Sequence, residues 1–336
     1  MAKYRGPLID YHAHLKGDGE IDMSDIPQYP ILHKLADLLE PQLYRGVNLF
    51  ARHGRNPRFH KLYREFTFLG FHELLRLLNK YRVDQFLASM DRNGIARAVV
   101  CVIEPFIGTI EVLDAIAPHR DRISVYCAVD PFEPRFLERL AFYVETGQVV
   151  GLKIHPPIAG PHPASEELMA MGAFAQDHAL PVFIHAGTFP FPMHPHHDDV
   201  EALEPFIARF DGIPIVLGHI GWDQHEKVLR LAEKYPHVHV ETSWQPPAII
   251  REAIDRLGKH RVLLGSDFPL LSQEVALRNV LDAVTPEEGE WVCHRNAERM
   301  IAHHVMHHPI HLVMPDPLSA EIGPLRDRGG VHRPLG

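Results

Sequence analysis

Five side chains that can bind a metal ion stand at the ends of short apolar runs in this sequence. They are His12, His14, His185, His219 and Asp267. His12 and His14 lie two residues apart, and residues at positions i and i+2 of a strand point to the same face. A single histidine among the 26 in the chain is more often a hydrogen-bonded core or rim residue. The five together predict a divalent-metal site, because imidazole and carboxylate groups are common metal ligands.

The elements that position these residues follow from the apolar pattern. Eight runs rich in Val and Ile predict strands buried on both faces, at residues 7–12, 95–103, 123–129, 149–155, 181–186, 214–219, 237–242 and 261–267. Between them, apolar residues recur every three or four positions, which predicts helices over 71–90, 133–145, 165–179, 201–210, 225–235, 248–257 and 273–284.

Strands that alternate with helices predict an α/β protein with a parallel sheet. Eight repeats fit a closed (β/α)8 TIM barrel, in which catalytic groups lie at the carboxyl ends of the strands. An open doubly wound sheet is the alternative, but no GxGxxG motif follows any predicted strand.

Two segments fall outside the repeat. Residues at about 15–70, after the first strand, are too long for a plain loop and predict an inserted cap. Residues 303–336 predict an extended C-terminal tail that packs along the barrel or reaches a neighbouring subunit, so a homodimer is possible. We therefore expect one barrel domain over residues 1–302, followed by the tail.

Composition excludes several other classes of protein. A formal net charge of -9 disfavours binding to nucleic acid. Three cysteines are too few for a disulfide framework and fit a reducing compartment. The sequence has neither a secretory signal nor a run of 18 apolar residues. We expect a cytoplasmic protein with a small-molecule substrate and no membrane or nucleic-acid partner.

Several segments in combination resemble a known family. IDYHAH, GLKIHP, FIHAGT, VLGHIG, LLGSDFP and RNAERM occur in the order of the amidohydrolase superfamily, across residues 7–302. The branch that they resemble most includes aminocarboxymuconate-semialdehyde decarboxylase and related aromatic-acid decarboxylases. The resemblance implies a distorted (β/α)8 barrel with one or two divalent metals bound by His12, His14 and His185. It also implies that Asp267 is a further ligand or the general base, and that His219 polarises the substrate or positions water.

We predict a metal-dependent hydrolase that uses a metal-activated water on a small, anionic amide, ester or lactone. The first alternative is a non-oxidative decarboxylase of an aromatic or unsaturated carboxylic acid on the same site. The second alternative is a metal-binding barrel without activity. Zinc is the expected metal because it suits three imidazoles and a carboxylate, and manganese is the alternative.

Four further residues are candidates for substrate binding. Lys153 and His155 share a face of the fourth predicted strand, and Trp222 and Trp244 follow the sixth and seventh. A carbamylated Lys153 would bridge two metals, as in some branches of the superfamily. We favour one metal and an unmodified Lys153, which either binds an anionic substrate or forms a salt bridge with a carboxylate such as Glu241. The two tryptophans line the pocket or pack under the loops.

Overall fold

A parallel sheet of eight strands forms the centre of the molecule, and its strands follow one another in sequence order. The computed structural model describes residues 3–17, 45–49, 51–52, 78–104, 106–159, 162–189 and 197–307. The strands are β1 (Leu8–Ala13), β2 (Ile95–Cys101), β3 (Ile123–Cys127), β4 (Val149–Ile154), β5 (Val182–Ile184), β6 (Ile215–Leu217), β7 (Val238–Glu241) and β8 (Val262–Leu263). All eight predicted strands are therefore present.

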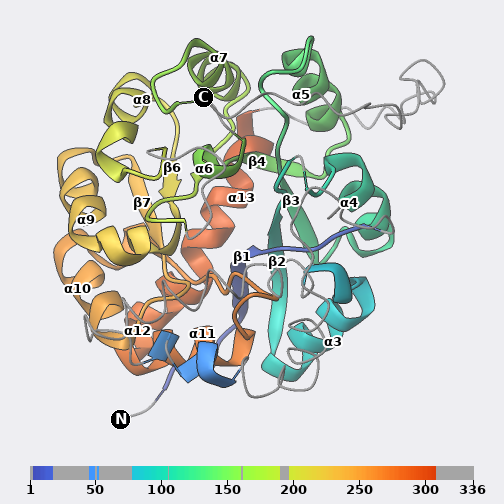
Figure 1. Cartoon of the computed structure of the whole chain (residues 1–336). Helices are drawn as coiled ribbons and strands as arrows, with labels where there is room; N and C mark the ends of the chain where they lie inside the picture. The colour runs from blue at the N-terminus through green and yellow to red at the C-terminus, as the bar shows by residue number, and fades with distance from the viewer. Residues whose placement is uncertain are drawn as a thin grey trace, which may run out of the picture.

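The sheet closes on itself. The backbone N–H of Tyr11 in β1 donates to the carbonyl of Leu264, next to β8, at 2.8 Å. Further along, Ala13 forms a parallel bridge with Phe268. Helices surround the strands in Figure 1. The predicted (β/α)8 TIM barrel is confirmed, and the open doubly wound sheet is wrong.

The helices lie between the strands, as the apolar periodicity predicts. They are α3 (Val83–Asn93), α4 (Thr109–Ile116), α5 (Phe136–Glu145), α6 (Pro156–Ala159), α7 (Glu166–Asp177), α8 (Glu204–Arg209), α9 (His225–Lys234), α10 (Pro247–Leu257), α11 (Gln273–Ala283), α12 (Pro286–Glu290) and α13 (Asn296–His307). The sequence reading missed α4, which is only eight residues long. It also ended the barrel at residue 302, whereas α13 continues to His307.

The helix predicted over residues 71–90 differs from the structure. Residues 71–77 lie outside the described part of the chain, and α3 begins only at Val83 because Arg82 is extended, with φ −97° and ψ 173°. The N–H of Arg82 donates to the Gln85 side chain at 2.7 Å, and its guanidinium donates to the carbonyl of Gly17 at 2.7 Å. These bonds favour a helix start at this point over a continuous helix.

A buried cluster fills the interior of the barrel and includes Ile9, Tyr126 and Phe183. Ala297 and Met300 of α13 pack into this cluster. Because Ile9 lies near the start of β1, α13 covers the amino end of the barrel, and the carboxyl end is left to polar side chains. All three cysteines are buried free thiols.

Most of the predicted cap and tail lies outside the described ranges. The division into barrel, cap and tail therefore stays a prediction, as does the homodimer. None of the helices that the structure describes is long and apolar enough to cross a lipid bilayer.

Candidate metal centre

Three of the predicted ligands meet at the carboxyl end of the barrel. His12 and His14 come from the end of β1, and Asp267 follows β8, the neighbour of β1 in the closed barrel. One ligand atom from each lies within 4.8 Å of the others, and all three residues are buried. Closure of the sheet therefore brings together residues that are more than 250 positions apart in the sequence.

In their neutral forms, the two imidazoles carry their proton on Nδ1, which leaves Nε2 without one. His12 donates from Nδ1 to Oε2 of Glu241 at 3.0 Å, and His14 donates from Nδ1 to the carbonyl of Cys101 at 2.6 Å. A carbonyl or carboxylate oxygen only accepts, so Nδ1 carries the proton in each neutral ring. Burial, together with the charge of Lys153, holds the pKa of His12 well below its usual value. Both Nε2 atoms therefore offer lone pairs.

These lone pairs point at one carboxylate oxygen. Oδ1 of Asp267 lies 2.8 Å from Nε2 of His14 and 3.4 Å from Nε2 of His12. Oδ1 is buried and has no hydrogen-bond donor among the residues that the structure describes. Lone pairs that converge in this way repel unless a cation lies between them, so the three residues fit a divalent metal.

The electrostatics keep Asp267 ionised. Burial alone would raise the pKa of its carboxyl group. A positive charge on the His12 or His14 ring outweighs burial and brings this pKa below its usual value. The other carboxylate oxygen, Oδ2, accepts a hydrogen bond from the indole N–H of Trp244 at 2.6 Å. Only Oδ1 therefore faces the two histidines.

The backbone is strained at three of the residues discussed here. The φ angles of His219, Trp244 and Asp267 are 57°, 64° and 59°. These left-handed conformations cost a non-glycine residue roughly 1–2 kcal/mol each. Such strain clusters at functional sites, where the surrounding structure holds it in place. The three residues follow β6, β7 and β8, so the strain lies at the same end of the barrel as the metal ligands.

His185, the fourth predicted ligand, stands beside this group but not within it. Its Nδ1 lies 3.2 Å from Nε2 of His219, and its ring stacks on His155 with ring centroids 4.1 Å apart. Nε2 of His185 is buried, with no hydrogen-bond partner among the described residues. This atom is available to a metal, but its part in the ligand set stays a prediction.

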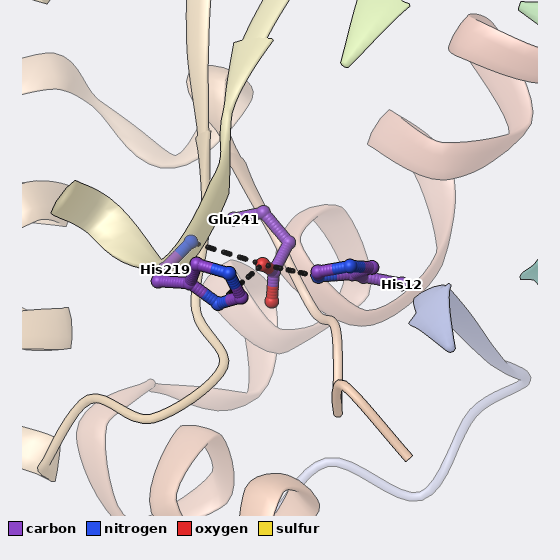
Figure 2. Close-up of side chains that lie close together, drawn as sticks. All are labelled: His12, His219 and Glu241. Atoms are coloured by element: carbon purple, nitrogen blue, oxygen red, sulfur yellow. Dashed lines mark hydrogen bonds and ion pairs between the residues drawn. The ribbon is translucent and has the colours of Figure 1, made fainter. Parts of the chain in front are cut away.

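The sequence reading missed the central role of Glu241. Its carboxylate lies between His12 and His219 in Figure 2 and accepts hydrogen bonds from the ring of His12 and the backbone of His219. Burial raises the pKa of Glu241, and the hydrogen bonds offset part of this effect. Glu241 ends the seventh apolar run, so the rule that selected the other strand-end residues also points to it.

Lys153 is a buried cation beside the ligands. Its Nζ lies 3.4 Å from Nε2 of His12 and 4.1 Å from the centre of the Phe183 ring. Burial lowers the pKa of Lys153. Among the described residues it has no ion pair within 4.0 Å, although the charges of Asp267 and Glu241 act on it, so the alternative of a salt bridge with a carboxylate such as Glu241 is not seen as a direct contact. Its ammonium group therefore remains available to an anion.

The other predicted substrate contacts are also placed. His155 packs against His185, and its Nδ1 is buried without a hydrogen-bond partner in the described ranges. The carbonyl of Trp222 accepts a hydrogen bond from the Gln245 side chain at 3.0 Å. Trp244 contacts Asp267, as described above. Substrate binding by His155 and the two tryptophans stays a prediction.

The barrel and its cluster of polar side chains define a class of protein, the (β/α)8 enzymes with a candidate metal centre at the carboxyl ends of the strands. A family model described as amidohydrolase matches residues 9–302. The chain therefore belongs to the amidohydrolase family and is an enzyme of that superfamily. The resemblance seen in its sequence segments is confirmed. A search among curated proteins found no match.

Solved structures of this superfamily share the fold at low sequence identity. A probable 2-pyrone-4,6-dicarboxylic acid hydrolase from Acinetobacter baumannii is 15% identical, with a TM-score of 0.58 over 88% of this chain and 100% of that chain. A zinc-bound amidohydrolase from Burkholderia multivorans is 15% identical, with a TM-score of 0.56 over 88% and 99%. A manganese-bound 5-carboxyvanillate decarboxylase from Novosphingobium aromaticivorans is 16% identical, with a TM-score of 0.58 over 90% and 99%.

Proposed function

We propose that the protein is a metal-dependent hydrolase of a small, anionic substrate. The observation that carries this proposal is the convergence of two unprotonated imidazole nitrogens on Oδ1 of Asp267. His12, His14 and Asp267 would hold the metal, and His185 would complete the set. A bound divalent metal polarises a carbonyl oxygen and makes water more acidic.

The residues of this chain supply the rest of the chemistry. Asp267 is ionised, so it can accept a proton from the attacking water and return it to the leaving group. Lys153 offers a buried positive charge for a carboxylate of the substrate. Burial lowers the pKa of His219 to about 4, so the ring is neutral at neutral pH. His219 would polarise the substrate or position the attacking water, as the family resemblance implies.

Decarboxylation is the second candidate, and the position of Lys153 favours it. The Lys153 ammonium group lies next to the predicted ligand His12 and has no carboxylate within ion-pair distance in the described ranges. Such a cation suits a substrate whose reacting group is itself a carboxylate. The hydrogen bond that the Trp244 indole donates to Oδ2 also makes the Asp267 carboxylate a weaker base. A weaker base suits decarboxylation better than hydrolysis, because decarboxylation does not require a water molecule to be deprotonated. Among the structural neighbours are decarboxylases of aromatic acids.

Two assays on the same preparation test the proposal. The full chain, loaded with zinc or with manganese, is given a panel of anionic amides, esters and lactones, and separately a panel of hydroxybenzoate-like acids. Hydrolysis that Asp267→Asn abolishes supports the hydrolase. Release of carbon dioxide without any hydrolysis would reject the hydrolase and support the decarboxylase. Activity that persists after complete removal of metal contradicts both.

A further inference from the structure

The segment Glu241–Gln245, which begins at the last residue of β7, contacts the candidate metal centre without supplying any predicted ligand. We propose that Glu241, Ser243 and Trp244 are positioning residues, which fix the proton positions of the nearby histidines and the orientation of Asp267. This inference rests on the metal-dependent function proposed above. Glu241 and Ser243 are neither predicted ligands nor predicted substrate contacts, and Trp244, predicted above to contact substrate, takes a different role here.

Glu241 sets the direction of two groups at once. Its side chain is fully buried, and Oε2 accepts the ring N–H of His12 at 3.0 Å and the backbone N–H of His219 at 3.1 Å. The first bond places the proton of His12 on Nδ1, so that Nε2 faces Asp267 as a lone pair. The second bond holds the left-handed turn at His219.

Ser243 extends this control to a second pair of histidines. Its hydroxyl donates to Oε2 of Glu241 at 2.9 Å, so the Ser243 oxygen accepts from Nδ1 of His219 at 2.6 Å. Nε2 of His219 then carries no proton and accepts from Nδ1 of His185 at 3.2 Å. His185 is left with an unprotonated Nε2. One hydroxyl thus directs a chain of hydrogen bonds that ends at a predicted ligand.

Trp244 fixes the carboxylate. Its indole N–H donates to Oδ2 of Asp267 at 2.6 Å, which leaves Oδ1 for the histidines. The ring itself is held by packing against the buried cluster of Ala51, Leu271 and Ala276. The indole therefore has little freedom to rotate, and it limits Asp267 to one orientation.

The test compares substitutions within one short segment of the full-length protein. Ser243→Ala removes the hydroxyl, and Trp244→Phe removes the indole N–H but keeps an aromatic ring. Thr242→Val is the matched control, because the Thr242 hydroxyl accepts only a long bond from the Gly265 backbone, at 3.4 Å, and contacts no predicted ligand. The readouts are the dissociation constant for Zn²⁺, measured by competition with a chelator, and the ¹⁵N shifts of the His219 ring.

We expect Ser243→Ala and Trp244→Phe each to weaken Zn²⁺ binding about 10- to 100-fold. Thr242→Val leaves it unchanged, and Ser243→Thr, which keeps a hydroxyl, restores most of the lost affinity. In the wild type the His219 ring shows one tautomer with the proton on Nδ1, and in Ser243→Ala it shows a mixture.

Two results would overturn the inference. One is Zn²⁺ affinity in Ser243→Ala and Trp244→Phe equal to that of the wild type. The other is a single Nδ1–H tautomer of His219 that survives loss of the Ser243 hydroxyl. If the wild type itself binds no Zn²⁺, the proposed function fails instead, and the tautomer of His219 in Ser243→Ala still decides the role of Ser243.

Discussion

Nε2 of His14 and Oδ1 of Asp267 lie only 2.8 Å apart. When the His14 ring is neutral, neither of these two atoms carries a proton. The proton of His14 is on Nδ1, where it bonds to the carbonyl of Cys101 at 2.6 Å. Two lone pairs at this distance repel each other unless a proton or a metal cation lies between them. This pair is therefore the strongest geometric sign of a metal in the barrel.

Metal content depends on this pair. We expect the wild type to hold about one tightly bound zinc or manganese ion per chain, and His14→Ala and His12→Ala to lose it, because each removes an unprotonated imidazole nitrogen. Inductively coupled plasma mass spectrometry after dialysis measures the ratio. His119→Ala, which changes a histidine near the amino end of β3, is the control. Equal metal content in all four proteins would show that the cluster is not the binding site.

Replacement of Asp267 by asparagine separates chemistry from folding. The amide keeps the hydrogen bond that Trp244 donates but loses the negative charge and the proton acceptor. Turnover in Asp267→Asn falls at least about 100-fold, the lower end for loss of a general base. Circular dichroism should show an unchanged fold. Retained turnover at wild-type metal content would contradict the role of Asp267 as the base.

Lys153→Met removes a buried charge and keeps a side chain of similar length. The folded protein no longer has to bury an ammonium group that lacks a carboxylate partner in the described ranges, so we expect its melting temperature to rise. A hydrogen bond to a charged group contributes about 1.5–3 kcal/mol, so kcat/KM for an anionic substrate falls about 10- to 100-fold. Lys234→Met, which changes an exposed lysine bonded to Glu204, is the control for both measurements.

The same variant decides whether Lys153 is modified. Unmodified Lys153 gives wild-type metal content in Lys153→Met and an unshifted peptide mass in the native protein. Loss of a second metal ion from the variant, or an added carboxyl mass on Lys153 in the native protein, would instead identify a carbamylated bridging lysine.

Glu288 links stability to pH at a site far from the chemistry. Arg251 donates to both of its carboxylate oxygens, at 2.7 and 2.9 Å, and the backbone N–H of Thr285 donates to one of them at 2.8 Å. The hydrogen bonds from Arg251 lower the pKa of Glu288 from 4.5 to about 2. A lowered pKa means that the stabilisation is complete above pH 4.5 and is lost as the pH falls towards 2.

Glu288→Gln should therefore be less stable than the wild type at pH 7, by about 0.5–1 kcal/mol for this partly buried pair. The difference should shrink as the pH approaches 2. Urea unfolding at several pH values measures it. Glu274→Gln, in an exposed pair with Arg278 on α11, is the control. A difference between Glu288→Gln and the wild type that does not change with pH would argue against ionisation as its cause.

Local patterns in the sequence were enough to predict the barrel and part of its site. Each strand is a short apolar run, and burial on both faces demands that pattern wherever the strand stands in the sheet. His12 and His14 were expected to share a face because the two-residue period of a strand is a local property. A helix cap is local in the same way: Ser165 directly precedes α7, and its side chain accepts the N–H of Leu168 at 3.2 Å.

The contacts between elements were decided only by the tertiary structure. Glu241, Ser243 and Trp244 form hydrogen bonds with His12, His219 and Asp267, which lie at or beyond the ends of other strands. No spacing along the chain encodes these bonds. The way in which the ends of β4, β5 and β7 meet decides two further contacts. It places His185 beside the ligand group, and it keeps Lys153 out of ion-pair distance of Glu241. Sequence periodicity fixes which face a side chain takes on its own strand, whereas barrel closure decides which atoms of different strands come within bonding distance.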